Sequence, residues 1–150
     1  MNNANITKND SKTQPTPLKQ IHVSAAVIFR TAAGGEKLVF ATQRGYGEWK
    51  DWWEFPGGKI EPGETPQQAL VRELMEEMEY PVEVGEKLVT VTHEYPDFSI
   101  TMTAFLCTPK GDANGFRRRE HADSKWCSQE ELKGLDWAAA DIDVVESIFH

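Results

Sequence analysis

Residues 55–77 read FPGGKIEPGETPQQALVRELMEE, a glycine-rich turn that leads into the strongest helix pattern of the chain. Thr65 is a suitable N-cap, a proline follows at the first helical position, and Gln68 completes a capping box with Thr65. The pattern predicts a helix that runs through Met78 and ends before Pro81, because a proline disfavours the helical conformation of the residue before it.

Three glutamates share one face of this predicted helix. Glu73, Glu76 and Glu77 stand at positions i, i+3 and i+4, where side chains are neighbours, and Arg72 can neutralise only part of their charge. Hard divalent cations take oxygen ligands, and Mg²⁺ binds a few carboxylates together with water and substrate phosphates. The glycines within 57–64 would let backbone carbonyls approach such an ion. The pattern indicates a Mg²⁺ or Mn²⁺ site for a phosphorylated substrate, with a solvated acidic face as the alternative interpretation.

The negative charge of the chain is concentrated around this helix. The 150 residues carry a formal net charge of −8, and the segment from Glu54 to Glu86 holds nine acidic and two basic residues, which gives −7. An acidic chain is poorly suited to nucleic-acid backbones and anionic membranes, which attract an excess of Lys and Arg. Once divalent cations are bound, however, the same charged segment can accept a polyphosphate.

The rest of the chain predicts a domain of mixed strands and helices. Short runs of β-branched and aromatic residues between turn residues indicate strands at 21–30, 37–44, 53–55, 82–95, 98–109 and 124–127. Ser128 begins a second capping box for a brief helix, and a last helix is expected at 140–149. In that helix Ile142, Val145 and Phe149 have the spacing of one apolar face. Strands on both sides of a helix favour a mixed sheet covered by helices.

The ends of the chain and its cysteines predict an intracellular protein with one domain. Residues 1–19 are polar and show no period, which indicates a flexible leader before a domain at 20–150. No apolar run reaches the roughly 20 residues of a membrane span, and no secretory signal is visible. Cys107 and Cys127 have neither disulfide-framework nor metal-ligand spacing, so we expect reduced, half-buried thiols in a cytoplasmic protein.

The spacing of glycine, glutamate and arginine in residues 55–77 resembles the signature of the Nudix hydrolases. Gly58, Glu64 and the run Arg72-Glu73-Leu74-x-Glu76-Glu77 stand at the offsets of that signature. The whole stretch is similar to the MutT-like (deoxy)nucleoside triphosphate pyrophosphohydrolases and to the related cytidine-nucleotide hydrolases, and the resemblance covers about residues 21–149. It implies an α+β fold, the Nudix-type α/β/α sandwich, in which helices flank a central mixed sheet.

The resemblance implies hydrolysis of a (deoxy)nucleoside triphosphate to the monophosphate and pyrophosphate, a nucleotide-pool sanitising and DNA repair activity that depends on Mg²⁺ or Mn²⁺. Arg72 would orient Glu73 and Glu76, and Glu64 would be a structural residue. The general base varies within the family, and its candidates here are Glu77, Glu76 and Glu120. The implied metal ligands are Gly57, Gly58, Glu73, Glu76, Glu77 and Glu120.

Four further residues are candidates for substrate binding. Arg44 ends a predicted strand and can meet a phosphate, unless it is an ordinary surface arginine. Phe55 and Tyr95 can stack on a base or belong to the core. Asp141 lies in a segment similar to the one that reads the base edge in this branch, and an aspartate there favours cytosine-type nucleotides and leaves 8-oxo-dGTP open. We expect Trp49, Trp52 and Trp53 to form either a lid over the base or a packed loop.

Two positions depart from the family pattern. Glu79 and Tyr80 replace the glycine and the aliphatic residue that usually follow the carboxylates, and a non-glycine residue in the left-handed conformation there costs up to about 1–2 kcal/mol.

Three alternative functions stay open. They are hydrolysis of ADP-ribose or a nucleotide sugar, a non-catalytic nucleotide sensor, and RNA-end hydrolysis with the arginines at 117–119. We expect a small-molecule nucleotide as partner, no nucleic-acid polymer, no membrane, and a monomer or homodimer.

Overall fold

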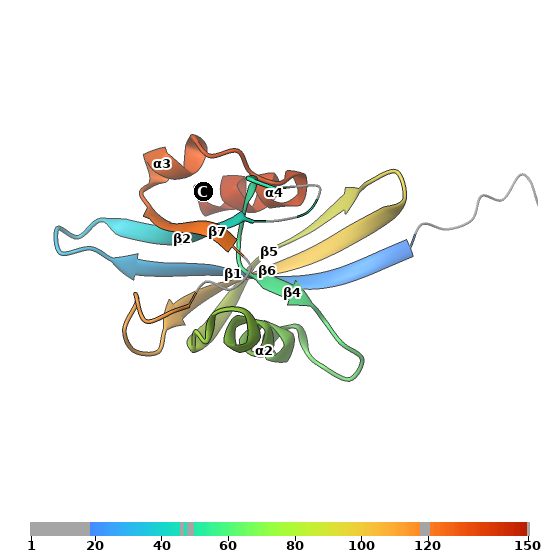
Figure 1. Cartoon of the computed structure of the whole chain (residues 1–150), viewed down its shortest axis with the longest axis horizontal. Coiled ribbons are helices and arrows are strands. Elements are labelled where there is room, and N and C mark those ends of the chain that lie inside the picture. The colour runs from blue at the N-terminus through green and yellow to red at the C-terminus, as the bar shows by residue number, and fades with distance from the viewer. Residues whose placement is uncertain (1–18, 46, 48–49, 118–120, 150) are drawn as a thin grey trace, which may run out of the picture.

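The computed structural model describes residues 19–45, 47, 50–117 and 121–149, so nearly all of the expected leader lies outside the described residues. The elements in these ranges are shown in Figure 1. They are β1 (Lys19–Thr31), β2 (Lys37–Arg44), β3 (Trp53–Glu54), β4 (Gly57–Lys59), α2 (Pro66–Met78), β5 (Val82–Glu94), β6 (Phe98–Pro109), β7 (His121–Cys127), α3 (Gln129–Lys133) and α4 (Ala139–Ile148).

The strands of the described residues form one seven-stranded mixed sheet, which confirms the sequence prediction. Its main path runs in the order β3-β2-β1-β6-β5, with β4 paired to β1 and β7 paired to β2. β1 lies parallel to β6, from Lys19 opposite Phe98 to Ile28 opposite Cys107, and the other pairs are antiparallel. Both predicted hairpins, β1–β2 and β5–β6, are present.

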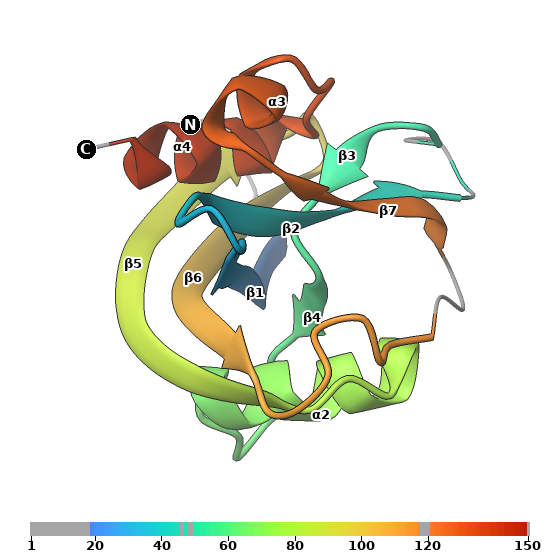
Figure 2. The ribbon, with the colours of Figure 1, turned by 90° about the vertical axis from the view of Figure 1, so that its left-hand side faces the viewer.

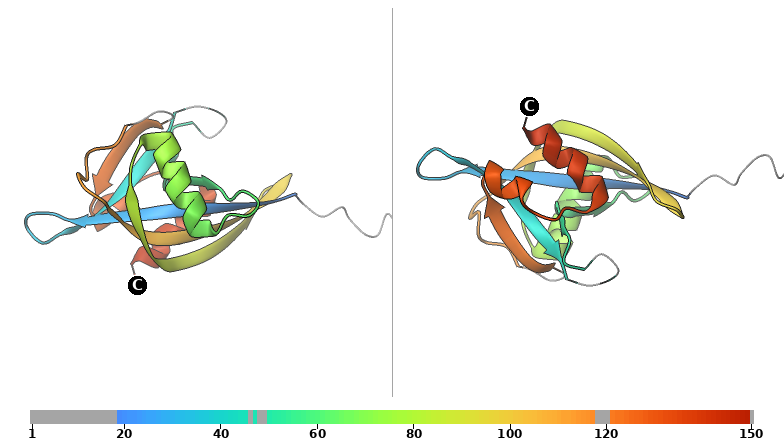
Figure 3. Two further views of the ribbon diagram at one scale, coloured as in Figure 1. Left: turned by 90° about the horizontal axis from the view of Figure 1, so that it is seen from below. Right: turned by 90° about the horizontal axis from the view of Figure 1, so that it is seen from above.

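The sheet separates two apolar cores. α2 covers one face of the sheet, whereas α3 and α4 lie over the opposite face (Figures 2 and 3). Leu70, Leu74 and Met78 of α2 pack into the first core, and Trp137 and Val144 belong to the second. This arrangement confirms the predicted α+β sandwich. In the described part of the chain, no helix combines the length and the apolar composition needed to cross a membrane.

The capping boxes predicted from the sequence fix the starts of two helices. At α2, the backbone N–H of Gln68 donates to Thr65 Oγ1 over 3.1 Å, and the Gln68 side chain accepts from the backbone N–H of Thr65 over 2.9 Å. Ser128 and Glu131 make the same reciprocal pair at α3. Both boxes satisfy backbone donors that the first turn of a helix leaves without helical partners.

The apolar face expected for the last helix was wrong at one position. Ile142 is 45% exposed, and the buried side of α4 is formed by Ala140, Asp141, Val144 and Val145. The error arose because the apolar spacing passes over Asp141, a polar residue that the fold nevertheless buries. The two thiols also differ from expectation: they are fully buried in the cores instead of half-buried.

The end of α2 shows how the chain accommodates its departure from the family pattern. Glu79 takes up the left-handed conformation, with φ 52° and ψ 41°, and its N–H donates to the Met75 carbonyl. The next residue, Tyr80, donates its N–H to the Leu74 carbonyl, buries its ring, and donates its hydroxyl to the Ala113 carbonyl over 2.6 Å. Burial raises the pKa of Tyr80 to about 12. The aromatic ring therefore anchors the helix end to the loop that follows β6.

Candidate active site

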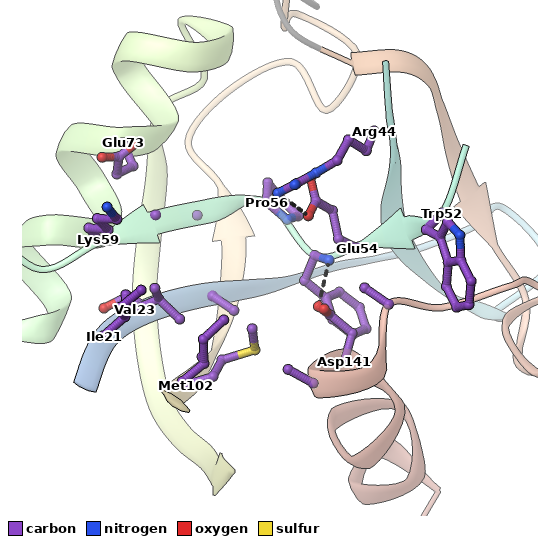
Figure 4. A pocket seen from close by; sticks show the side chains of 18 of the residues that line it. Ile21, Val23, Arg44, Trp52, Glu54, Pro56, Lys59, Glu73, Met102 and Asp141 are labelled. Carbon is purple, nitrogen blue, oxygen red and sulfur yellow. Dashed lines mark hydrogen bonds and ion pairs between the residues drawn. The ribbon is translucent and has the colours of Figure 1, made fainter. Parts of the chain in front are cut away.

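A cavity of about 470 Å³ lies between the α2 side and the α4 side of the molecule (Figure 4). At one end it is lined by Glu73 and Glu77 of α2 and by the β4 segment. Asp141 of α4 and Trp52 lie at the other end, beyond Pro56. The volume is within the range of about 300–1,000 Å³ typical of small-molecule sites.

Two glycines bring the backbone of β4 against its neighbours at the carboxylate end. A Cβ at Gly58 would collide with the carboxylate of Glu73, and a Cβ at Gly57 would collide with the backbone carbonyl of Ser24. The hydroxyl of Ser24 in turn donates to the Pro66 carbonyl over 2.7 Å, which ties β1 to the first turn of α2. The glycines of the sequence motif are thus required by close packing of β1, β4 and the glutamate-bearing helix.

Arg72 connects the loop before α2 with the carboxylates on the helix. Its Nε and Nη2 donate to the two oxygens of Glu64 over 2.7 and 3.0 Å, and its Nη1 donates to Glu73 over 2.9 Å and to Glu76 over 3.1 Å. A fifth hydrogen bond runs from Nη2 to the Lys59 carbonyl. The hydrogen bonds from Arg72 lower the pKa of Glu64, and the guanidinium itself is held in its charged form. Bidentate pairs of this kind fix geometry as well as charge.

The candidate metal ligands occupy different positions. Glu73 and Glu77 line the cavity, whereas the side chain of Glu76 is 61% exposed and turned to Arg72. Within the described ranges, no three carboxylate, histidine or cysteine side chains form a group that could hold a metal ion. The side chains that line this end nevertheless include the carboxylates of Glu73 and Glu77, and carboxylate oxygens are ligands that a hard divalent cation prefers. Glu120 lies outside the described residues.

Asp141 is the candidate base-reading residue at the other end of the cavity. Asp141 is 3% exposed in the first turn of α4, and its Oδ1 accepts the backbone N–H of Phe55 over 3.0 Å. Burial raises the pKa of Asp141 to about 8, and the nearby Glu54 carboxylate adds to this shift. The Phe55 N–H and the Arg44 guanidinium act in the opposite direction. The carboxyl therefore keeps its proton at neutral pH, when it offers one donor and one acceptor.

Arg44 lines the cavity at the same end as Asp141. Its Nη2 lies 3.3 Å from Glu54 Oε1, and Figure 4 places this ion pair away from Glu73. The structure thus sets Arg44 beside the predicted base site, at a distance from the carboxylates expected to serve the phosphates.

The two aromatic candidates are packed against other rings. Phe55 is 4% exposed and stacks on Trp137 at a centroid distance of 4.7 Å. Tyr95 stacks on Phe98 at 4.8 Å and meets the edge of His93, and burial raises its pKa. Both residues line the cavity, but each has one ring face occupied by the protein itself.

Three residues that line the cavity were not predicted from the sequence as site residues. Lys59 and Glu54 line the cavity next to residues of the motif, and Trp52, expected only as part of a lid or packed loop, lines it too. Lys59 directly follows the motif glycines, so its position was the available signal. Of the other two tryptophans of that loop, Trp53 packs against the core and Trp49 lies outside the described residues.

Comparisons with known proteins agree with this geometry. The family model described as NUDIX domain matches residues 20–147. The chain is 36% identical over 131 residues to a CTP pyrophosphohydrolase of Escherichia coli, covering 87% of this chain and 92% of the relative. It is 44% identical over 91 residues to an 8-oxo-dGTP diphosphatase of Proteus vulgaris, covering 60% and 78%.

Solved structures show the same architecture. The solution structure of the E. coli ORF135 protein superposes with a TM-score of 0.70 at 34% identity, covering 88% of this chain and 90% of that one. A MutT protein from Methanosarcina mazei gives a TM-score of 0.72 at 23% identity, covering 88% and 94%, and supports the fold alone.

Proposed function

Because this chain belongs to the Nudix family, we propose that it hydrolyses (deoxy)nucleoside triphosphates to the monophosphate and pyrophosphate. The observation that carries the proposal is one cavity with Glu73 and Glu77 at one end and the buried carboxyl of Asp141 at the other. Such a cavity can hold a polyphosphate and a base at the same time. The names of the relatives, a CTP pyrophosphohydrolase and an 8-oxo-dGTP diphosphatase, support the same reaction.

The carboxylate end is the proposed metal site. Glu73 and Glu77 would hold Mg²⁺ or Mn²⁺ together with Glu76, Glu120 and a carbonyl of Gly57 or Gly58. When bound, the cation supplies neutralisation of charge on the phosphates and on the leaving group. Arg72 keeps Glu73 in place through its hydrogen bond, and Lys59 adds a positive charge to this end of the cavity.

We assign the role of general base to Glu77 among the three candidates, because it lines the cavity whereas Glu76 is turned to Arg72. The carboxylate of Glu77 takes a proton from water as the water oxygen forms a bond to phosphorus. The bridging P–O bond breaks, and the monophosphate separates from pyrophosphate.

Asp141 is the proposed reader of the base edge. Its Oδ1 already accepts from Phe55, so the proton is expected on Oδ2, and the group presents a donor beside an acceptor. Cytosine, with N3 as acceptor and its amino group as donor, matches this pair. The O6 and N7–H edge of 8-oxoguanine also matches, whereas O6 and N7 of unmodified guanine are both acceptors. Phe55 and Tyr95 would form the walls around the base. Arg44 would either neutralise the charge of Glu54 through their ion pair or bind an oxygen of the substrate.

The proposed setting is the cytoplasmic nucleotide pool. The cavity has the volume of a small-molecule site, which supports free nucleotides as substrates over a nucleic-acid polymer or a membrane. We propose that the chain acts there as a monomer or homodimer, removing nucleotides before they reach DNA.

Incubation with Mg²⁺ and a panel of nucleotides tests the proposed function. The panel contains CTP, 8-oxo-dGTP, dGTP and ADP-ribose, and the products are identified by chromatography. We expect CTP and 8-oxo-dGTP to give the monophosphate and pyrophosphate, with a kcat/KM above that of dGTP. Cleavage of ADP-ribose alone, or binding of nucleotides without turnover, would contradict the proposal and favour the nucleotide-sugar hydrolase or the sensor.

A further inference from the structure

Four aliphatic side chains form one stretch of the cavity wall. They belong to Ile21 and Val23 of β1 and to Ile100 and Met102 of β6. In the parallel pairing of these strands, Ile21 lies opposite Ile100. Two residues further along, Val23 lies opposite Met102. Since alternate residues of a strand point to the same face, the four side chains lie on one face of the sheet, and we call them the apolar floor.

The apolar floor is open to the cavity although its side chains are hydrophobic. Ile21, Val23 and Ile100 are partly exposed, and Met102 is 9% exposed. Covering aliphatic surface of this kind is favourable, because the free energy gained grows with the apolar area removed from water. A ligand in the cavity is therefore stabilised where it places an apolar part of its own on the floor.

The apolar floor offers almost no hydrogen-bonding groups to such a ligand. None of its four side chains has an N–H or O–H group, and the thioether of Met102 is only a weak acceptor. At Val23 the backbone of β1 is paired with β6 on one side and with β4 on the other, and β6 is paired with β1 and β5. The hydroxyl of Ser24, also at the cavity, donates to the Pro66 carbonyl over 2.7 Å. A hydroxyl laid on the floor thus loses its hydrogen bonds to water without a replacement.

The floor lies along the path between the two ends of the cavity. Val23 pairs with Lys59 of β4, so the floor begins beside the carboxylate end. In Figure 4, Met102 lies between Glu73 and Asp141. The sugar of a nucleotide joins its base to its phosphates. A substrate with its phosphates near Glu73 and its base at Asp141 therefore carries its sugar across the apolar floor.

We propose that the apolar floor makes this chain selective for 2′-deoxyribonucleotides. The inference rests on the proposed function, since it requires the phosphates and the base at opposite ends of the cavity. The 2′-hydroxyl of ribose must give up water on the floor, whereas the 2′-methylene of deoxyribose has no hydrogen bond to lose. An apolar site rejects an added hydroxyl only moderately, so we expect a preference of about tenfold.

The ratio of kcat/KM for dCTP to kcat/KM for CTP tests this selectivity in the full chain. It should be about tenfold in the wild type. Val23→Thr places a hydroxyl in the floor with little change of shape, and it should bring the ratio to within about threefold because the ribose hydroxyl gains a partner. Both substrates are measured on one protein, so any unfolded fraction cancels in the ratio.

Val89→Thr is the matched control for the added hydroxyl. Val89 is also a partly buried valine packed against the core, but it is not among the described residues that line the cavity. This variant should keep the wild-type ratio. A ratio near one in the wild type, or a ratio that Val23→Thr leaves unchanged, would overturn the proposal while triphosphate hydrolysis stands.

Two further probes separate polarity from size and binding from catalysis. 2′-Deoxy-2′-fluoro-CTP carries fluorine, which donates no hydrogen bond, in place of the hydroxyl, so its kcat/KM should be close to that of dCTP. A value close to that of CTP would overturn the proposal. In calorimetry, dCMP should bind more tightly than CMP, and equal affinities would contradict the role of the floor. Tighter binding of dCMP without hydrolysis of any triphosphate would instead defeat the proposed function alone.

Discussion

At the residue scale, two carboxyl groups of one cavity are prepared for different tasks by their surroundings. Burial, with a smaller contribution from the nearby Glu54 carboxylate, favours the protonated form of Asp141. Glu73 instead accepts a hydrogen bond from Arg72, which is permanently charged. Glu77 faces the cavity from the same helix as Glu73. The difference between the two ends lies in burial and neighbours, which local sequence motifs do not report.

Substitution of Glu77 tests its role at this scale. Glu77→Gln keeps the shape of the side chain but removes a proton acceptor and a charged ligand, so kcat should fall by roughly 100-fold or more. Circular dichroism should show an unchanged fold. Glu83→Gln, an exposed change on β5, is the control and should leave kcat as it is. Near-normal turnover by the Glu77 variant would remove this residue from the catalytic set.

At the element scale, the end of α2 combines a conformational cost with tertiary anchoring. Glu79 holds a backbone conformation that favours glycine, and its ion pair with Arg117 spans 3.7 Å between exposed side chains. An exposed pair of this kind contributes little. Tyr80 offsets the cost through its buried ring and its hydrogen bond to the Ala113 carbonyl.

Glycine at position 79 should therefore stabilise the protein. Glu79→Gly relieves the left-handed strain, and the free energy of unfolding in urea should rise by about 1 kcal/mol. The same change in an extended segment, Glu83→Gly, should lower it, because glycine loses more chain entropy on folding. Destabilisation by Glu79→Gly would mean that the Glu79 side chain contributes more than its contacts suggest.

Local signals explain which elements the sequence could predict. Capping boxes at Thr65 and Ser128 and the alternation of the hairpins act over a few residues, so they could be recognised directly. The short strand at 57–59 and the parallel pairing of β1 with β6 depend on partners far along the chain. The apolar face of α4 was misjudged at Ile142 for the same reason, since only the tertiary fold shows that Asp141 is buried.

The candidate site was predictable to a similar extent. The motif predicted the glutamates and the contacts of Arg72 with Glu73 and Glu76, because these residues are close in sequence. The burial of Phe55 depends on its stacking against Trp137, a residue far along the chain, and no local pattern encodes that contact.

At the scale of the whole molecule, the site joins the two sides of the sheet. α2 brings the carboxylates from one side and α4 brings Asp141 from the other, and the strand pair β1–β4 lies between them. The cavity therefore exists only in the folded domain. It also brings acidic side chains together, namely those of Glu54, Glu73, Glu77 and Asp141.

Divalent cations should stabilise this arrangement. Ligands that bind the folded chain alone raise its stability, by about 2.7 kcal/mol when present at 100 times their Kd. Thermal unfolding should therefore occur at a higher temperature with Mg²⁺ than with EDTA, and the difference should shrink in Glu77→Gln. Equal shifts in the wild type and in the variant would place the bound cation elsewhere.

The central claim, that a neutral Asp141 reads the base of a triphosphate substrate, is tested most directly by kcat/KM for CTP between pH 6.5 and 9.5 in the wild type and in Asp141→Asn. Asparagine keeps a donor and an acceptor but does not titrate, and the ratio of the two proteins removes pH effects that they share. Since the pKa of Asp141 is about 8, the ratio of wild type to variant should be constant below that pH. Above it, the ratio should fall about tenfold per pH unit as the donor is lost. A ratio that stays constant through pH 9.5 would contradict the account.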